Sequence, residues 1–145
     1  MVFEIGPVEL ELVFKLVLAA VLGMLIGVER KIHRKPAGMR THSLVCVGAT
    51  LFTVISLYIT GSNVDVSRIA AGVVTGVGFL AAGIIFKSED RVLGLTTAAE
   101  IWVMAAIGVA VGAGYYLAAV VTAIIVLIIL VPLKYVEREA KNALE

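Results

Sequence analysis

Charged residues are scarce in this sequence, and long polar stretches are scarcer still. Only 16% of the 145 residues are Asp, Glu, Lys or Arg, whereas 61% are hydrophobic. A soluble domain of average composition has about 25% charged residues and 45–50% apolar ones, and a small core cannot hide many more. The mean hydropathy of +1.06 therefore excludes an ordinary soluble domain and indicates a membrane protein.

Catalytic and metal-binding motifs are also missing. The sequence contains no Gly-rich phosphate loop and no pair of His residues at ligand spacing. Its single cysteine, Cys46, cannot form an intrachain disulfide. We therefore expect no enzyme and no cofactor, and we leave any metal ligands unassigned. The net charge of +1, with eleven acidic residues among the basic ones, gives no reason to expect a nucleic-acid partner.

Long apolar runs are what the sequence does contain. A helix needs about 20 mainly apolar residues to cross the hydrocarbon of a bilayer. Such runs lie near 10–28, 42–60, 68–86, 95–112 and 114–133. We expect an all-α polytopic protein in which 1–145 form a single transmembrane domain of five helices, without a soluble C-terminal domain. The last two helices are joined by a short turn at 112–114, because Gly adopts a positive φ at little cost.

The basic residues predict an orientation for this bundle. Short cytoplasmic loops carry an excess of Lys and Arg, and residues 29–42 are the most basic stretch of the chain. Alternating the loops puts the N-terminus outside and the C-terminus inside, in a multi-pass protein of the cytoplasmic (inner) membrane with the lipid bilayer as its first partner. The basic residues on the inner side are Arg30, Lys31, Arg34, Lys35, Arg40, Lys87, Arg91, Lys134, Arg138 and Lys141.

Small residues predict how the helices pack. In lipid, small side chains let two helix backbones approach closely. Gly23 and Gly27 form such a pair on the first span, and Gly72, Gly76 and Gly83 lie on the third. We therefore place the third span at the centre of the bundle. The fifth span is bulky on every side, which is typical of lipid contact or of a subunit seam, so a homodimer stays open as an alternative.

A weak internal repeat accompanies these spans. A shift of 56 residues superposes the first two spans on the next two and aligns Gly38 with Gly94 and Thr41 with Thr97. This suggests a parallel two-hairpin repeat followed by a fifth helix, an arrangement found among transporters. Apolar segments also align by chance, so coincidence is an equally good explanation.

Glu100 is the polar residue that is hardest to explain structurally. It lies inside the fourth span, where a charged side chain costs roughly 2.5–3.5 kcal/mol on insertion scales, so such residues usually face the bundle interior and pair. Thr96 and Thr97 lie one turn before it and extend a polar stripe toward the cytoplasmic side. We interpret Glu100 as part of a polar site. The alternative is a structural role, with Glu100 protonated or reaching back to the interface.

Other polar residues gather at the same predicted membrane face. Residues 29–30 close the first span and residues 40–42 open the second, so that Glu29 or Glu100 is expected to pair with Arg40. For Glu29 alone, a structural bridge across the helix ends is an equally good interpretation. The candidate cytoplasmic-face site consists of Glu29, Arg30, Arg40, Thr41, His42, Thr96, Thr97 and Glu100.

At the opposite face, Asp65 and Arg68 flank the start of the third span. Asp at such a position can accept hydrogen bonds from the free N–H groups of the first helical turn. We therefore interpret Asp65 as a helix cap, with ion access at the outer face as the lesser alternative.

Several short motifs together resemble the MgtC/SapB family of bacterial and archaeal membrane proteins. They are Gly-Val-Glu-Arg at 27–30, Lys-Pro-Ala-Gly-Met-Arg-Thr-His at 35–42, Arg-Ile-Ala-Ala at 68–71, Thr-Gly-Val-Gly-Phe-Leu-Ala-Ala-Gly at 75–83 and Gly-Leu-Thr-Thr-Ala-Ala at 94–99. The sequence departs from the family pattern at Gly72, Ala81 and Glu100. The matching positions are Glu29, Arg30, Lys35, Pro36, Gly38, Arg40, Thr41, His42, Arg68, Gly76, Gly83, Gly94, Thr97 and Trp102.

The resemblance implies a five-helix membrane domain linked to magnesium homeostasis. It favours a regulator over a pump. Well-characterised family members resemble regulators that bind other membrane proteins, including the ATP synthase. The competing hypothesis is a carrier or channel for Mg²⁺ or a proton-coupled cation that uses the intramembrane polar residues. The third is a purely structural role for Glu100.

Overall fold

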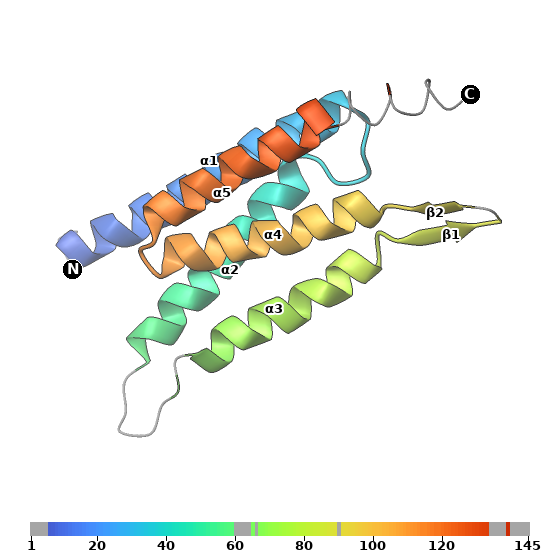
Figure 1. Ribbon diagram of the computed structural model, residues 1–145. Helices are drawn as coiled ribbons and strands as arrows, with labels where there is room; N and C mark the ends of the chain where they lie inside the picture. The colour runs from blue at the N-terminus through green and yellow to red at the C-terminus, as the bar shows by residue number, and fades with distance from the viewer. Residues whose placement is uncertain (1–5, 60–64, 66, 90, 134–138, 140–145) are drawn as a thin grey trace.

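Five helices and one β-hairpin form the part of the chain that the structure describes. This structure is a computed structural model, and it describes residues 6–59, 65, 67–89, 91–133 and 139. The elements, shown in Figure 1, are α1 (Pro7–Ile32), α2 (Met39–Tyr58), α3 (Ser67–Ala82), β1 (Phe86–Ser88), β2 (Arg91–Leu93), α4 (Leu95–Gly112) and α5 (Tyr116–Leu130). The expected all-α fold is thus confirmed.

Three of these helices are long and apolar enough to cross a membrane: α1, α2 and α4. The other two, α3 and α5, are apolar but have only 16 and 15 residues. At 1.5 Å per residue, 16 residues extend about 24 Å, somewhat less than the roughly 30 Å of a bilayer core. Of the basic residues that predicted the orientation, Lys134, Arg138 and Lys141 lie outside the described residues.

The helix ends follow local sequence signals. The N-terminus of α1 has Pro7 in its first turn, where the N–H that proline lacks has no helical partner to lose. At its C-terminus Arg34 takes a positive φ of 53°, and the N–H of Lys35 donates to the carbonyl of Arg30 over 2.9 Å. Gly114, with φ 86°, ends α4 in the same way, which confirms the predicted glycine turn.

The centre of the bundle is formed by α2 and α4, not by α3. Figure 1 shows α3 at one side of the bundle. Its substantial contacts are with α2 and α4. Only Val73, Val77 and Ala81 of α3 are buried. A Cβ added at Gly72 or Gly76 would meet no atom within 4 Å. The prediction that α3 is central was wrong, because Gly72 and Gly76 face open space and not another helix.

Close helix contacts instead depend on glycines in α1 and α4. A Cβ at Gly23 would lie 2.6 Å from the Cα of Ser43 on α2, and one at Gly27 would collide with Met39. On α4, a Cβ at Gly108 would collide with the carbonyl of Cys46, and one at Gly112 would lie 2.7 Å from the carbonyl of Thr50. Both glycine pairs therefore allow α2 to lie against its neighbours, which stabilises the bundle through close backbone packing.

The β-hairpin was not predicted from the sequence. The expected third span runs to residue 86, but α3 ends at Ala82, and Phe86–Ser88 pairs antiparallel with Arg91–Leu93. Gly94 follows with a φ of 88°, and a Cβ there would collide with the carbonyl of Ile84. The hairpin also reduces the structural similarity between the two halves of the proposed repeat. Gly38 and Gly94 each precede a helix, but the connections before them differ in structure.

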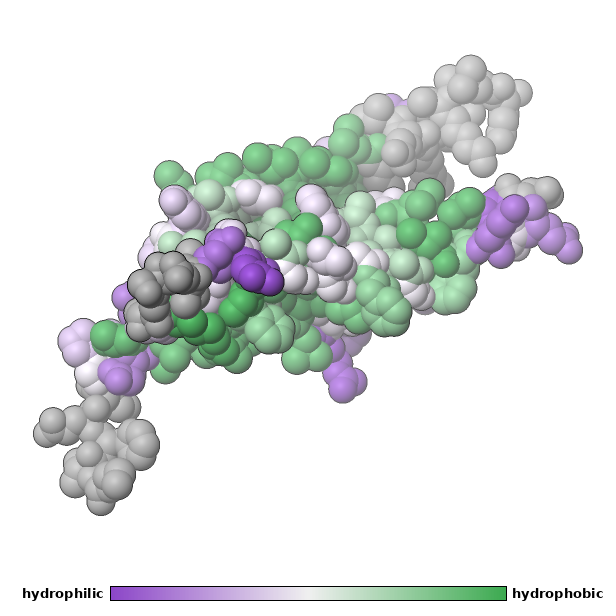
Figure 2. All heavy atoms as spheres, turned by 90° about the horizontal axis from the view of Figure 1, so that it is seen from below, coloured by the Kyte–Doolittle hydropathy of each residue, from purple (hydrophilic) through white to green (hydrophobic). Residues whose placement is uncertain are grey.

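The ends of the helices alternate between the two ends of the molecule. In Figure 1 the connection between α1 and α2 lies at the same end as the β-hairpin, and the turn between α4 and α5 lies at the other. Figure 2 shows hydrophobic side chains over most of one face, with hydrophilic ones mainly toward the ends. Exposed apolar side chains include Leu44 at 72% and Leu117 at 78%. Such a surface suits hydrocarbon rather than water.

Candidate functional site

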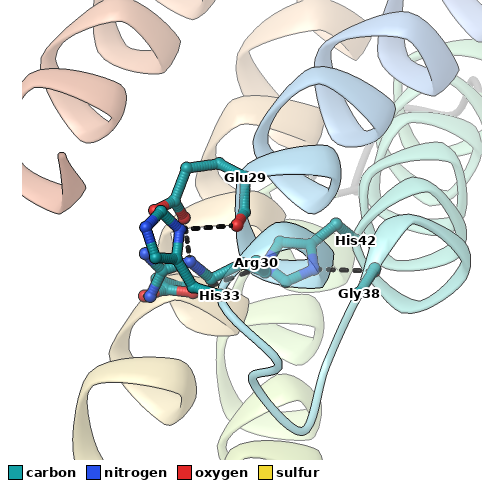
Figure 3. Close-up of polar contacts among 6 residues, drawn as sticks. Glu29, Arg30, His33, Gly38 and His42 are labelled. Carbon is teal, nitrogen blue, oxygen red and sulfur yellow. Dashed lines mark hydrogen bonds and ion pairs between the residues drawn. The ribbon is translucent and has the colours of Figure 1, made fainter.

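A buried cluster of charged and polar side chains joins α1, α2 and α4. Its members are Glu29 and Arg30 on α1, His42 on α2 and Glu100 on α4, all less than 10% exposed. His33 lies just after α1 at the edge of the cluster (Figure 3). Because charged residues are almost never fully buried unless paired, the contacts within this cluster determine whether it can exist.

Arg30 is the cation that holds the cluster together. Its Nη1 donates to Oε1 of Glu100 over 2.8 Å, and its Nε contacts Oε2 of Glu29. The guanidinium thus bridges a carboxylate of its own helix and one of α4. Charge-assisted hydrogen bonds of this kind are among the strongest in proteins.

The expected partner of these carboxylates, Arg40, lies elsewhere. Arg40 is exposed, and it forms no ion pair with any residue in the described ranges. The prediction of a pair with Arg40 was therefore wrong. Arg30 lies three residues after Gly27 and four after Ile26, both buried, so helical spacing places it on the inward face of α1. On α2 the inward position belongs to His42.

His33 contributes to the cluster, although it was not among the predicted site residues. Its Nδ1 lies 3.0 Å from the backbone carbonyl of Glu29 and 2.7 Å from the Oε1 of the same residue. Because residues four apart lie on one helix face, the spacing of Glu29 and His33 was a signal that could have been used. About a quarter of the His33 side chain is exposed.

His42 faces Glu100 from α2. Its Nδ1 lies 2.9 Å from the carbonyl of Gly38, while its Nε2 lies 3.6 Å from Oε2 of Glu100. The second distance is too long for a hydrogen bond. Both Nε2 and Oε2 are buried without a hydrogen-bond partner. Since nearly all buried polar atoms in proteins are paired, this gap needs an explanation.

The remaining predicted site residues are dispersed. Thr97 is buried, but Thr41 and Thr96 are exposed, so the expected threonine stripe faces two directions. The described residues include no group of three or more His, Cys, Asp or Glu side chains placed to hold a metal ion. Arg68 is exposed near the start of α3.

Asp65 lies just before α3 and supports its first turn. Its Oδ1 accepts hydrogen bonds from the hydroxyl of Ser67 over 2.6 Å and from the backbone N–H of Ser67 over 2.9 Å. These two bonds stabilise the ionised form and lower the pKa of the Asp65 carboxyl. The carboxylate therefore satisfies a free donor at the helix start, as a capping residue does.

An apolar groove separates α2 from α3. Its volume is about 510 Å³, and it includes the open faces of Gly72 and Gly76, where a side chain would meet nothing. The groove does not contain any member of the charged cluster. Its lining residues are Leu44, Val45, Gly48, Ala49, Phe52, Ile69, Gly72, Val73, Gly76, Val77 and Leu80.

Comparison with known proteins gives a consistent set of relatives. The chain is 43% identical over 127 residues to the "Putative magnesium transporter YhiD" of Escherichia coli (strain K12), covering 83% of this chain and 59% of that protein. It is 51% identical over 96 residues to "Protein MgtC" of Brucella suis biovar 1 (strain 1330), covering 66% of this chain and 40% of that protein.

A third relative is an uncharacterized protein of Haemophilus influenzae, which is 40% identical over 132 residues, or 85% of this chain and 56% of that protein. The chain thus spans 40–59% of the length of these relatives. The comparison with solved structures found no significant match. The model of the MgtC family matches residues 16–139, and the chain belongs to this family.

Proposed function

We propose that this chain is a regulatory membrane protein that binds a transmembrane helix of another membrane protein in the groove between α2 and α3. The groove is the observation that supports this proposal. It is lined by apolar side chains and by three glycines, Gly48, Gly72 and Gly76, at which an added Cβ would meet no atom of the described residues within 4 Å. In membranes such small-residue surfaces are where helices approach each other. This surface supports a role in binding another helix.

The chemistry of the groove favours a helix as the occupant. The groove contains no charged residue and no side chain that donates a hydrogen bond, so a polar ligand has nothing to bind. The spacing of Gly72 and Gly76 on one helix face matches the small-xxx-small pattern that packs helix against helix. A helix of a second copy of this chain is a distinct occupant, which the experiment below separates.

Five membrane crossings complete this proposal, with the N-terminus outside and the C-terminus inside the cytoplasmic membrane. Support comes from the alternation of helix ends (Figure 1), the apolar surface (Figure 2) and the basic residues at the connection after α1. The shorter helices α3 and α5 can cross if flanking residues reach the interfaces or the bilayer thins locally.

A link to magnesium is the part of the proposal that rests on relatives. The Escherichia coli relative carries the name of a putative magnesium transporter, and the regulated partner is therefore expected to act in magnesium homeostasis. The chain covers only 59% of that relative, so this assignment is a proposal for the transmembrane part alone.

Two glycines of α3 provide a matched test. Gly76 and Gly78 are both open in the protomer, but only Gly76 lines the groove. We expect Gly76→Leu to abolish co-purification of a membrane partner from native membranes and Gly78→Leu to leave it intact. Equal retention in both variants would contradict the proposal. Recovery of only a differently tagged copy of the chain would show that the occupant is a second protomer instead.

Cation transport is the second candidate function, favoured by the buried charged cluster and by the name of the Escherichia coli relative. A carrier must release its cargo, whereas the carboxylates here are already paired with Arg30. Purified protein in liposomes provides the test. Movement of Mg²⁺, Na⁺ or H⁺ that Arg30→Gln changes would support transport, and absence of flux would exclude it.

A further inference from the structure

The gap between His42 and Glu100 contains two acceptors and no donor. The Gly38 carbonyl can only accept a hydrogen bond, so the Nδ1 of His42, 2.9 Å away, must carry a hydrogen and donate it. A neutral imidazole then has a lone pair at Nε2. An ionised Glu100 likewise presents only lone pairs at Oε2, 3.6 Å from this nitrogen. Two lone pairs therefore face each other.

Burial makes this arrangement unfavourable unless something is added. His42 is fully buried and Glu100 is 4% exposed, and neither Nε2 nor Oε2 has a hydrogen-bond partner. An unsatisfied acceptor in a low-dielectric site loses its interaction with water and gains nothing in return. One proton on either atom would convert the pair into a donor and an acceptor.

The charges of the cluster lead to the same conclusion. Glu29 and Glu100 together bring two negative charges, and Arg30 brings one positive charge to both of them. With both histidines neutral, the buried cluster keeps one uncompensated negative charge. Buried charges without partners are usually neutralised by a change in protonation. One added proton balances the cluster.

We propose that His42 and Glu100 together form a site that binds one exchangeable proton at the junction of α1, α2 and α4. Placed on either Nε2 or Oε2, the proton makes one atom a donor to the other, so that a small approach across the 3.6 Å gap joins α2 to α4. This link adds to the bridge that Arg30 makes from α1 to α4. Because the two groups are coupled, the titration step belongs to the pair and not to either residue. The cluster thus links the packing of three helices to protonation.

The surroundings of the pair are defined by the three helices. From α1, Arg30 bonds the other oxygen of Glu100, and Glu29 with His33 lies on the far side of that guanidinium. On α2, Cys46 is buried one turn after His42, and Arg40 is exposed. From α3 and α5, the described residues bring no charged partner to the pair.

The proposal predicts the sign of a pH effect. The added proton joins α2 to α4, so the protonated form of the pair is the one that stabilises the packing of these two helices. The contribution of the pair to stability is therefore present while the pair holds this proton and is lost as pH rises through the step at which the proton leaves. In Glu100→Gln, the side-chain amide donates to a neutral His42 without an added proton, so the step should disappear.

Spectroscopy of the full chain in lipid nanodiscs tests the site directly. Nitrogen-15 NMR of histidine reports the state of His42, and infrared absorption reports a protonated carboxyl. At neutral pH we expect either an imidazolium at His42 or a protonated Glu100, lost in one shared step on raising the pH. Finding His42 neutral and Glu100 ionised across the neutral range would overturn the proposal, and this result requires no variant to fold.

Two controls assign the step to this pair. His33→Gln replaces the other histidine of the cluster, and the step should persist in it. Loss of the step in His33→Gln, with retention in Glu100→Gln, would place the proton between His33 and Glu29 and overturn the assignment. Added Mg²⁺ alone should leave the His42 signal unchanged. A shift of that signal with Mg²⁺ would show that the gap takes a metal ion instead.

Discussion

At the scale of single residues, Arg30 has the most consequential environment in the described chain. It is 2% exposed and is the only cation bonded to two buried carboxylates in the described residues. Removing one member of a buried ion cluster leaves the others without compensation, which costs far more than losing a surface pair.

A pair of arginine substitutions measures this difference. We expect Arg30→Gln to lower the free energy of unfolding by roughly 3–5 kcal/mol, because it leaves Glu29 and Glu100 buried without a cation. Arg40→Gln, at an exposed position, should change it by less than about 0.5 kcal/mol. Denaturant titration in mixed micelles compares the two variants. Equal losses would contradict the assignment of Arg30 as the central cation.

The sequence predicted most members of this site but not their pairing. Glu29, Arg30, His42 and Glu100 were all recognised, because charged or polar residues in apolar spans attract attention. The choice between Arg30 and Arg40 depends on which side of each helix faces inward, and that rotation is set by tertiary packing. Turning a helix about its axis by a few residue positions would change which arginine faces the carboxylates.

At the scale of helices, glycines have opposite roles in α3 and α4. Gly108 of α4 lies directly against the backbone of α2, and the hydroxyl of Thr50 donates to its carbonyl over 2.9 Å. Gly76 of α3 faces an open groove. Composition alone does not distinguish a glycine that packs against another helix from one that faces an open groove. The prediction from the sequence therefore put the wrong helix, α3, at the centre of the bundle.

Alanine substitution separates the two kinds of glycine. Gly108→Ala is expected to destabilise the protein by about 1–3 kcal/mol, because its methyl group would overlap the Cys46 carbonyl. Gly76→Ala is expected to be neutral or to stabilise by up to about 1 kcal/mol, since alanine favours the helix and meets no atom. The midpoint of thermal unfolding in detergent compares them. The reverse order would contradict the placement of α2 against α4.

The start of α3 should respond to pH through Asp65. Because hydrogen bonds from Ser67 lower the pKa of this carboxyl, its stabilising effect is present above the ordinary pKa of Asp and is lost as pH falls through the lowered one. Amide protection factors in the first turn of α3 should decline over that acidic range. In Asp65→Asn the decline should be absent. An unchanged decline in the variant would assign the effect to another group.

At the scale of the whole molecule, the order and class of the helices followed from hydropathy, because every span must satisfy its own backbone hydrogen bonds in lipid. The β-hairpin at 86–93 could not be predicted from that pattern. Its strands are only three residues each, too short for alternation to be visible.

Thiol labelling tests the proposed orientation. In a Cys46→Ala background, Ser88→Cys in the hairpin should react with a membrane-impermeant reagent only in inverted vesicles. Tyr115→Cys, at the exposed turn before α5, should react only from the outside of intact cells. If both positions react from the same side, the chain between them cannot cross the membrane an odd number of times. That result would contradict the proposed crossing by α4.

The groove between α2 and α3 is the surface on which the proposed function depends, and two phenylalanines test it most directly. Phe52 and Phe79 are both exposed, but only Phe52 lines the groove. With a photoreactive phenylalanine at each position in native membranes, Phe52 should crosslink to one discrete membrane protein that Gly76→Leu displaces, and Phe79 should not. Identical products from both positions, or lipid adducts alone from Phe52, would contradict the account.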